Sequence, residues 1–117
     1  MANNTAFMPC GKTINIVTNA STANNLTMTS DSPCQNYRIA NHASQPVYVW
    51  ISAASSPVNV AVPTGNGAKA QYAVVIPNGT VAVIEGPQVS SGTAVQVSAI
   101  AETGTPDVYV TPGEGMN

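Results

Sequence analysis

Charged side chains are scarce in this sequence. Its 117 residues include three lysine or arginine and five aspartate or glutamate residues, so 7% of the chain is charged, against about 25% in an ordinary soluble domain. With three basic residues and a formal net charge of -2, the chain lacks the basic surface that would bind a nucleic acid or an anionic membrane. A surface with so little charge either tolerates weak repulsion or is covered in an assembly, and we favour the assembly.

Long apolar runs are also missing. No segment approaches the roughly 18 residues of a membrane helix, so we expect no membrane partner. The first ten residues, MANNTAFMPC, lack the basic and apolar regions of a secretory signal, and we therefore expect the chain to be made and kept in the cytoplasm. Cys10 and Cys34 could close a loop, but two cysteines without a secretory signal are more often free thiols.

Residues that could carry chemistry form no recognisable motif. The single histidine, His42, excludes a site with several histidine ligands, and its loop-like surroundings favour a solvated side chain. Among the scattered acidic residues, Glu85 stands on an apolar strand, where a carboxylate at the rim is favoured over a catalytic acid. We predict no enzymatic activity, no metal and no cofactor. A small hydrolase stays open only if Glu85 or His42 lies in a pocket with a second polar group.

The most informative segment is QYAVVIPNGTVAVIEGP, residues 71–87. Asn78-Gly79 between β-branched runs predicts a β-hairpin, because a type I′ turn needs positive φ at both central residues. Such a hairpin is apolar on both faces. We expect one face to pack on the core, and the other, with Val75, Ala82 and Ile84, to face outward and be covered by another chain.

Alternating apolar runs elsewhere predict further strands at residues 12–18, 26–29, 35–40, 45–53, 58–62, 94–101 and 107–111. Gly86-Pro87 and Pro112-Gly113 are expected to end the strands that precede them. The resulting eight or nine short strands, separated by turns, predict an all-β fold, an antiparallel β-sandwich of jelly-roll or Greek-key type. The length predicts a single domain spanning 1–117, in which residues 1–11 form an extended N-terminal arm anchored by Phe7 and Met8.

The strand at 45–53 separates its apolar residues by type. Aliphatic residues, among them Val47 and Val49, alternate with Tyr48 and Trp50, and we expect the aliphatic face to point inward. The two aromatic rings then form an outer platform for a sugar or a protein partner. The alternative is that Trp50 belongs to the core and the two faces are inverted.

Two segments, VVIPNGTVAVIEGPQ at 74–88 and VSAIAETGTPDVYVTPGEGM at 97–116, together with the Asn/Thr-rich start, resemble the small virion proteins of tailed bacteriophages. The likeness is to capsid decoration (cement) proteins and minor head proteins. It implies a β-sandwich, often a trimer, that binds the major capsid protein on the outside of an icosahedral shell. It also implies synthesis in the host cytoplasm, and similar small β proteins occur in tails and fibres.

These observations predict a non-enzymatic structural virion protein that stabilises the assembled head, with the N-terminal arm open to exchange between copies. The residues predicted to contact partners are Phe7, Met8, Tyr48, Trp50, Val75, Ala82 and Ile84. Two alternatives remain: a tail or fibre accessory protein, and a carbohydrate-binding β-sandwich that uses Tyr48 and Trp50 as its stacking surface.

Overall fold

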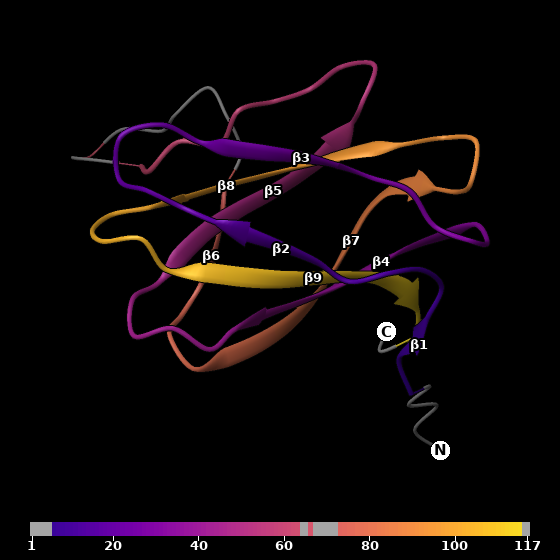
Figure 1. Cartoon of the computed structure of the whole chain (residues 1–117), viewed down its shortest axis with the longest axis horizontal. Coiled ribbons are helices and arrows are strands. Elements are labelled where there is room, and N and C mark those ends of the chain that lie inside the picture. Colours follow the sequence, from indigo (N-terminus) through magenta and orange to yellow (C-terminus); the bar gives the residue numbers. More distant parts are fainter. Residues whose placement is uncertain (1–5, 64–65, 67–72, 116–117) are drawn as a thin grey trace.

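The computed structural model describes residues 6–63, 66 and 73–115. These residues form strands joined by turns and loops, with no helix among them (Figure 1). The strands are β1 (Met8–Pro9), β2 (Ile14–Val17), β3 (Asn24–Met28), β4 (Cys34–Asn41), β5 (Val47–Ala53), β6 (Val74–Ile76), β7 (Thr80–Val89), β8 (Val95–Ala101) and β9 (Asp107–Glu114). The predicted all-β class is confirmed.

The strands form two antiparallel sheets. In sheet A the order is β2-β9-β4-β7, and β1 continues the edge of β9 beyond β2; in sheet B the order is β3-β8-β5-β6. Eight strands therefore pair from the outside of the sequence inward: β2 with β9, β3 with β8, β4 with β7, and β5 with β6. This nested pairing across two sheets is the jelly-roll arrangement, so the strand pairings select the jelly-roll version of the predicted sandwich.

The core lies between the inner faces of the two sheets. On β5 the aliphatic residues point inward, with Val47 and Val49 fully buried, whereas Tyr48 and Trp50 are half-buried on the outer face. The predicted orientation of this strand is therefore confirmed. Residues that share the core include Ile16, Met28, Tyr37, Ile39, Ile51, Ile76, Val89, Val95, Val97, Ala99, Val108 and Val110.

The Asn78-Gly79 turn is present, but the predicted hairpin is wrong. Gly79 has φ 69°, the left-handed conformation that an Asn-Gly turn requires. The strands on either side nevertheless belong to different sheets, because β6 pairs with β5 and β7 pairs with β4. The turn is thus a corner that carries the chain from sheet B to sheet A, and residues 71–72 of the predicted hairpin lie outside the described residues.

This corner changes which side chains of β7 face outward. Ala82 and Ile84 lie opposite Ile39 and Tyr37 of β4 and pack against the core. The outward orientation predicted for Ala82 and Ile84 is therefore wrong, because the inner face of β7 is set by its pairing with β4 and not by a pairing with β6. Val75, on β6, does point outward and is 49% exposed.

The strand predicted at 58–62 is also wrong. This segment carries no strand pairing; instead the amide of Val58 donates to Ser52 Oγ (3.1 Å) and the amide of Val60 to Ser98 Oγ (2.9 Å). Ser52 and Ser98 belong to β5 and β8, and Val60 is buried. The segment therefore lies across part of the outer face of sheet B, held by serine hydroxyls in place of a neighbouring strand.

Two predicted strand ends are wrong as well. β7 continues through Gly86-Pro87, and β9 continues through Pro112-Gly113 to Glu114. The register of β4 against β7 shifts between Cys34 and Asn36, so the Gly86-Pro87 region forms an irregularity within the strand. In β9 the carbonyl oxygen of Pro112 accepts a hydrogen bond from the Cys10 amide (2.8 Å). Proline has no amide hydrogen and so needs no acceptor at its own position, and both strands pass through these residues.

Tyr37 of β4 links the core to this irregularity. Its side chain is fully buried, and its hydroxyl donates to the carbonyl oxygen of Pro87. The ring lies over Gly86, where an added Cβ would be 3.1 Å from a ring carbon. Burial raises the pKa of Tyr37 above the ordinary tyrosine value, so the folded protein favours the neutral hydroxyl.

Replacing Tyr37 with phenylalanine is expected to lower the free energy of unfolding near neutral pH by about 1–3 kcal/mol, because the Pro87 carbonyl loses its donor. This deficit should shrink as the pH rises above about 10. The raised pKa stabilises the folded state fully below the pKa of an unfolded tyrosine, and this contribution is lost as the pH rises toward the folded pKa. Urea unfolding of both proteins at neutral and strongly alkaline pH measures the difference, and a deficit that does not change with pH would contradict the assignment.

Candidate interaction surfaces

The described part of the chain contains no group of three histidine, cysteine, aspartate or glutamate residues able to hold a metal ion. His42 is exposed and lies beside Tyr109, with ring centroids 6.1 Å apart. Glu85 is exposed and opposite Asn36. Neither His42 nor Glu85 lines the two cavities described below. In the residues that the structure describes, no helix has the length and apolar character needed to span a membrane.

An apolar row crosses the outer face of sheet A. Tyr109 of β9 and Val81 of β7 are the two register partners of Ala40, which lies between them on β4. Ala40 is buried, while Tyr109 is 41% and Val81 43% exposed. The two larger side chains therefore flank a small central residue and form a row of three apolar residues on this face, next to the exposed Arg38.

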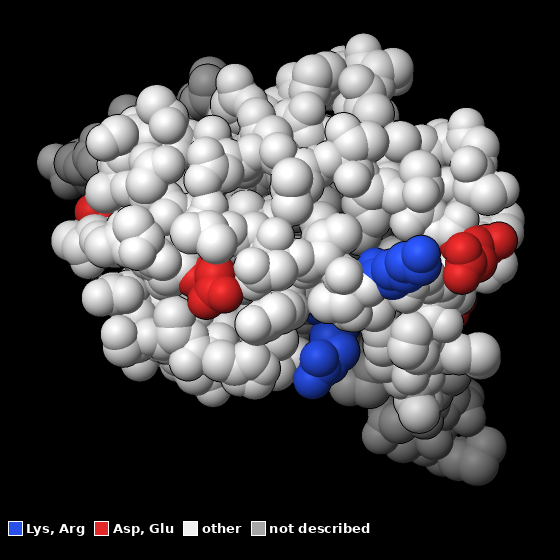
Figure 2. All heavy atoms as spheres, in the orientation of Figure 1, with Lys and Arg blue, Asp and Glu red and all other residues white. Residues whose placement is uncertain are grey.

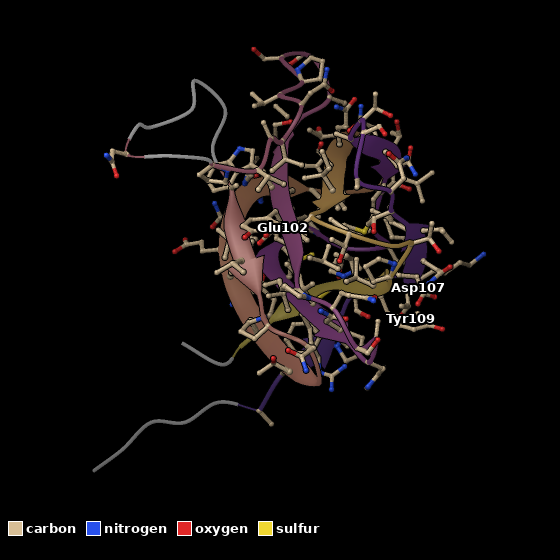
Figure 3. All side chains as sticks on the ribbon, turned by 90° about the vertical axis from the view of Figure 1, so that its left-hand side faces the viewer. Glu102, Asp107 and Tyr109 are labelled. Carbon is tan, nitrogen blue, oxygen red and sulfur yellow. The ribbon has the colours of Figure 1, made fainter. Side chains whose placement is uncertain are left out.

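At the β2 edge Tyr109 lies opposite the polar Asn15, and Val17 stands one pair further along the strand. Val17 is 53% exposed and pairs with Asp107, the residue two before Tyr109. Asp107 accepts a hydrogen bond from the Asn15 side-chain amide (2.9 Å), and Asp107 and Tyr109 lie near one another in Figure 3, well away from Glu102. We call Val17, Ala40, Val81 and Tyr109 the sheet A patch.

The outer face of sheet B carries the predicted aromatic platform. Tyr48 and Val75 are register partners on β5 and β6, and Trp50 follows Tyr48 on the same face. The Tyr48 hydroxyl donates to Glu102 Oε1 (2.5 Å), and this hydrogen bond to the carboxylate raises the pKa of Tyr48. We call Tyr48, Trp50 and Val75 the sheet B patch; it lies on the face that residues 57–62 partly cover.

The N-terminal segment is held on its own chain. Met8 pairs with Glu114 and Pro9 with Gly113 in β9. The Phe7 ring lies over Gly113, in the space that a side chain at that position would fill. Met8 is 63% exposed. The described part of the predicted arm, residues 6–11, is therefore extended and fastened to the C-terminal strand, and residues 1–5 lie outside the described residues.

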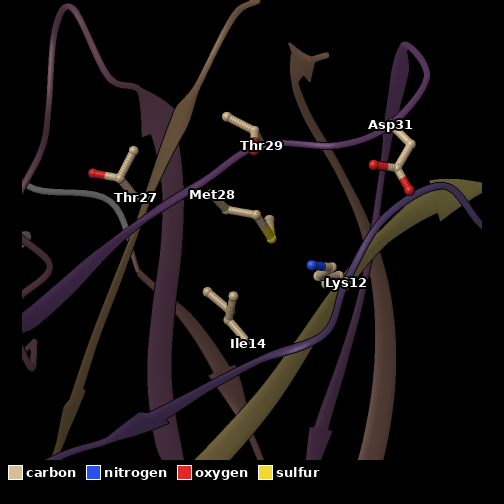
Figure 4. Close-up of a pocket in the computed structure, with 6 residues that line it drawn as sticks. All are labelled: Lys12, Ile14, Thr27, Met28, Thr29 and Asp31. Atoms are coloured by element: carbon tan, nitrogen blue, oxygen red, sulfur yellow. The ribbon is translucent and has the colours of Figure 1, made fainter. Parts of the chain in front are cut away.

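A groove runs between β2 and β3, at the edge where the two sheets part. One cavity of about 280 Å³ lies at the end near Lys12 and Asp31, with Ile14 and Met28 projecting into it (Figure 4). A second cavity of about 250 Å³ continues along the same two strands, from Asn15–Val17 to 24–26. Both strands are sheet edges, since β2 pairs with β9 and β3 with β8.

Charge adds little to these surfaces. On the face drawn in Figure 2, charged side chains are few, and one basic side chain lies beside an acidic one at the right of the view. Packing and hydrogen bonding, and not long-range electrostatics, are therefore the means by which this chain can bind a partner.

No model of a known protein family matches the chain, and no curated protein matches it. Among solved structures, a crystal structure of the P-domain of Penaeus vannamei nodavirus has a TM-score of 0.47 and 11% sequence identity, covering 92% of this chain and 99% of that chain. The jelly-roll assignment given above rests on the strand pairings themselves.

The structure divides the seven predicted contact residues among three places. Tyr48, Trp50 and Val75 come together on sheet B, Ala82 and Ile84 pack against the core, and the arm residues Phe7 and Met8 lie along β9. None of these predictions of partner contact is tested by the fold itself.

Sequence reasoning missed the sheet A patch. Tyr109 lies between the buried residues Val108 and Val110, so simple alternation already indicated that its ring points outward. The predicted hairpin, which points Ala82 and Ile84 outward, gives β7 the wrong face, and Val81 lies outward instead.

Proposed function

We propose that this chain is a non-enzymatic structural protein of a virus particle, and more specifically a decoration protein on the outer surface of a tailed-phage head. The observation that carries the proposal is the sheet A patch, in which Val17, Val81 and Tyr109 stay 41–53% exposed. Exposed apolar side chains gathered on one face are typical of surfaces that bind another protein. Only 7% of the residues are charged, so few charged side chains are available to keep this apolar surface solvated.

Two further observations support the proposal. The eight-strand jelly roll is an architecture that viral capsid domains use, as lectin domains also do. Because one fold serves many functions, this supports a class and does not select a role. The likeness of residues 74–88 and 97–116 to small phage virion proteins favours the capsid role over the lectin role.

The mechanism follows from mass action. A protein that binds the assembled shell and not its free subunits stabilises the assembled state, by about 2.7 kcal/mol per site when its concentration is 100 times its Kd. Burial of a half-exposed valine or tyrosine contributes on the order of 1 kcal/mol, so affinity builds from several such contacts. A trimer would multiply these contacts on the major capsid protein, which is the partner we propose.

Co-sedimentation tests this function. The purified chain is mixed with shells of the particle that were assembled without it, and the pellet is assayed for bound protein. We expect saturable binding that changes little as salt is raised, because few charges take part. Protein that stays in the supernatant at every concentration would contradict the proposal.

A carbohydrate-binding role is the second candidate. The observation that favours it is the pair Tyr48 and Trp50 on one outer face, with the Glu102 carboxylate at the Tyr48 hydroxyl. Proteins bind sugars by stacking them on aromatic rings and by hydrogen-bonding them to nearby polar groups such as a carboxylate. A Trp50→Ala variant that still pellets with shells but loses retention on a glycan array that retains the wild type would favour this second role.

A further inference from the structure

Two thiols lie where the N-terminal segment meets sheet A. Cys10 follows β1, and Cys34 is the first residue of β4. Cys34 is 1% exposed and belongs to the core, while Cys10 is partly exposed and packs against that core. Both are free cysteines in this structure.

The backbone around Cys10 is held on both sides. Its amide donates to the carbonyl oxygen of Pro112 in β9 (2.8 Å), and its carbonyl oxygen accepts from the amide of Asp31 (2.7 Å), in the turn that leads into β4. The same turn leads into Cys34, and Cys10 packs against the buried cluster that contains Cys34. The Cys10 thiol also lies 3.6 Å from the Met8 carbonyl oxygen, which accepts from it.

We propose that Cys10 and Cys34 form an intrachain disulfide under oxidising conditions, and that this bond fastens the N-terminal segment to the body of the jelly roll. Cys10 already packs against the cluster that contains Cys34, and its carbonyl oxygen is bonded to the turn that leads into β4, so the bond needs side-chain rotation and little movement of the backbone. The inference is independent of the proposed function, because it concerns only the chain's own thiols.

With glutathione disulfide as the oxidant, the reaction takes two exchange steps. The Cys10 thiolate attacks one sulfur of glutathione disulfide, which forms a mixed disulfide and releases one glutathione thiolate. Cys34 then loses its proton to solvent, and its thiolate attacks the Cys10 sulfur and releases the second glutathione. Two protein thiols are oxidised by two electrons, and one glutathione disulfide is reduced to two glutathione molecules.

The order of these steps follows from exposure. Cys10 is the partly exposed thiol and meets the oxidant first. Burial raises the pKa of Cys34 to about 11, and the neighbouring Cys10 thiol adds to this. Cys34 is therefore a poor first nucleophile and acts as the resolving thiol, where its proximity to the Cys10 sulfur compensates for its low thiolate fraction.

The disulfide has a structural consequence. In the reduced chain the two residues of β1 and the Phe7 ring hold the segment on β9, and such a short pairing can open. The oxidised chain keeps the segment on its own sheet. If the segment instead exchanged between copies, the same two cysteines would join two chains. The product of oxidation therefore shows whether the segment lies on its own chain or on another copy.

The experiment uses the full chain, reduced with dithiothreitol, freed of reductant and then incubated with glutathione disulfide. Intact-mass spectrometry and a non-reducing gel are read together with the melting temperature. We expect a monomeric product that has lost two hydrogen atoms and carries no glutathione, and a melting temperature that rises by roughly 10 °C. The Cys34→Ser variant should stop at a stable glutathione adduct on Cys10, and the Cys10→Ser variant should stay unmodified.

Three results would overturn the proposal: wild-type thiols that stay free, a wild-type chain that ends as a glutathione adduct, or a disulfide found only between chains. The mass of the oxidised wild-type protein decides among these outcomes without any variant, so a substitution that impairs folding does not affect the test.

Discussion

Replacing Val81 with aspartate is expected to abolish binding to the shell, lowering the affinity by about 100-fold or more, which is about 2.7 kcal/mol. Val81 is 43% exposed beside Ala40 on the outer face of sheet A, so the free protein tolerates a carboxylate there. In the complex the carboxylate would be buried without a partner, at a cost of several kcal/mol. Co-sedimentation with shells across a range of protein concentrations measures the change.

The matched control is Val75→Asp. Like Val81, Val75 lies on an edge strand of its sheet. It is 49% exposed and points outward from the other sheet. The two variants carry the same charge change at similar exposure, and they differ in the face that they alter. We expect Val75→Asp to keep most of the shell binding; if it loses binding while Val81→Asp keeps it, the contact lies on sheet B and the sheet A assignment is wrong.

Replacing Gly113 with alanine is expected to lower the free energy of unfolding by about 2 kcal/mol, a typical cost of overpacking. A Cβ at Gly113 would overlap the Phe7 ring and lie 2.5 Å from the Met8 carbonyl oxygen. The ring can rotate away, but the Met8 oxygen belongs to the backbone of β1, so that strand must leave β9. Urea unfolding measures the free energy, and hydrogen exchange of the Cys10 amide, which donates to Pro112, measures the loss of the segment.

Gly92→Ala is the control for this substitution. An added Cβ at Gly92 meets nothing within 4 Å, so alanine there should leave the free energy of unfolding unchanged or raise it slightly. The Phe7→Ala/Gly113→Ala double variant should not recover the loss, since the overlap with the Met8 carbonyl oxygen remains. A Gly113→Ala protein as stable as Gly92→Ala, with a protected Cys10 amide, would show that the segment does not lie on Gly113.

The sequence predicted those strands whose side chains alternate over a long run. β5 and β8 carry buried aliphatic residues at every second position over their first five residues and lie within one or two residues of the predicted bounds. Residues 58–62 alternate as clearly, yet their amides bond to serine hydroxyls. Alternation reports that one side of an extended segment is buried, and it does not report whether a neighbouring strand pairs with the backbone.

The candidate site was harder to predict, for a related reason. Asn78-Gly79 specified the turn correctly, but a local turn cannot choose between a hairpin partner and a strand in the opposite sheet. That choice depends on the pairings of β6 with β5 and of β7 with β4, which are distant in sequence. Because the predicted partner strand is wrong, the predicted orientation of β7 is inverted as well: Ala82 packs against the core and Val81 faces outward.

The proposed function requires that other chains in the particle cover the sheet A patch. A cryo-electron microscopy map of shells with the protein bound tests this most directly, because the jelly roll can be placed in the density by its two sheets. We expect the outer face of sheet A, with Val17, Val81 and Tyr109, to lie against the major capsid protein or a neighbouring copy. A map in which that face points to solvent, or in which bound shells show no added density, would contradict the account.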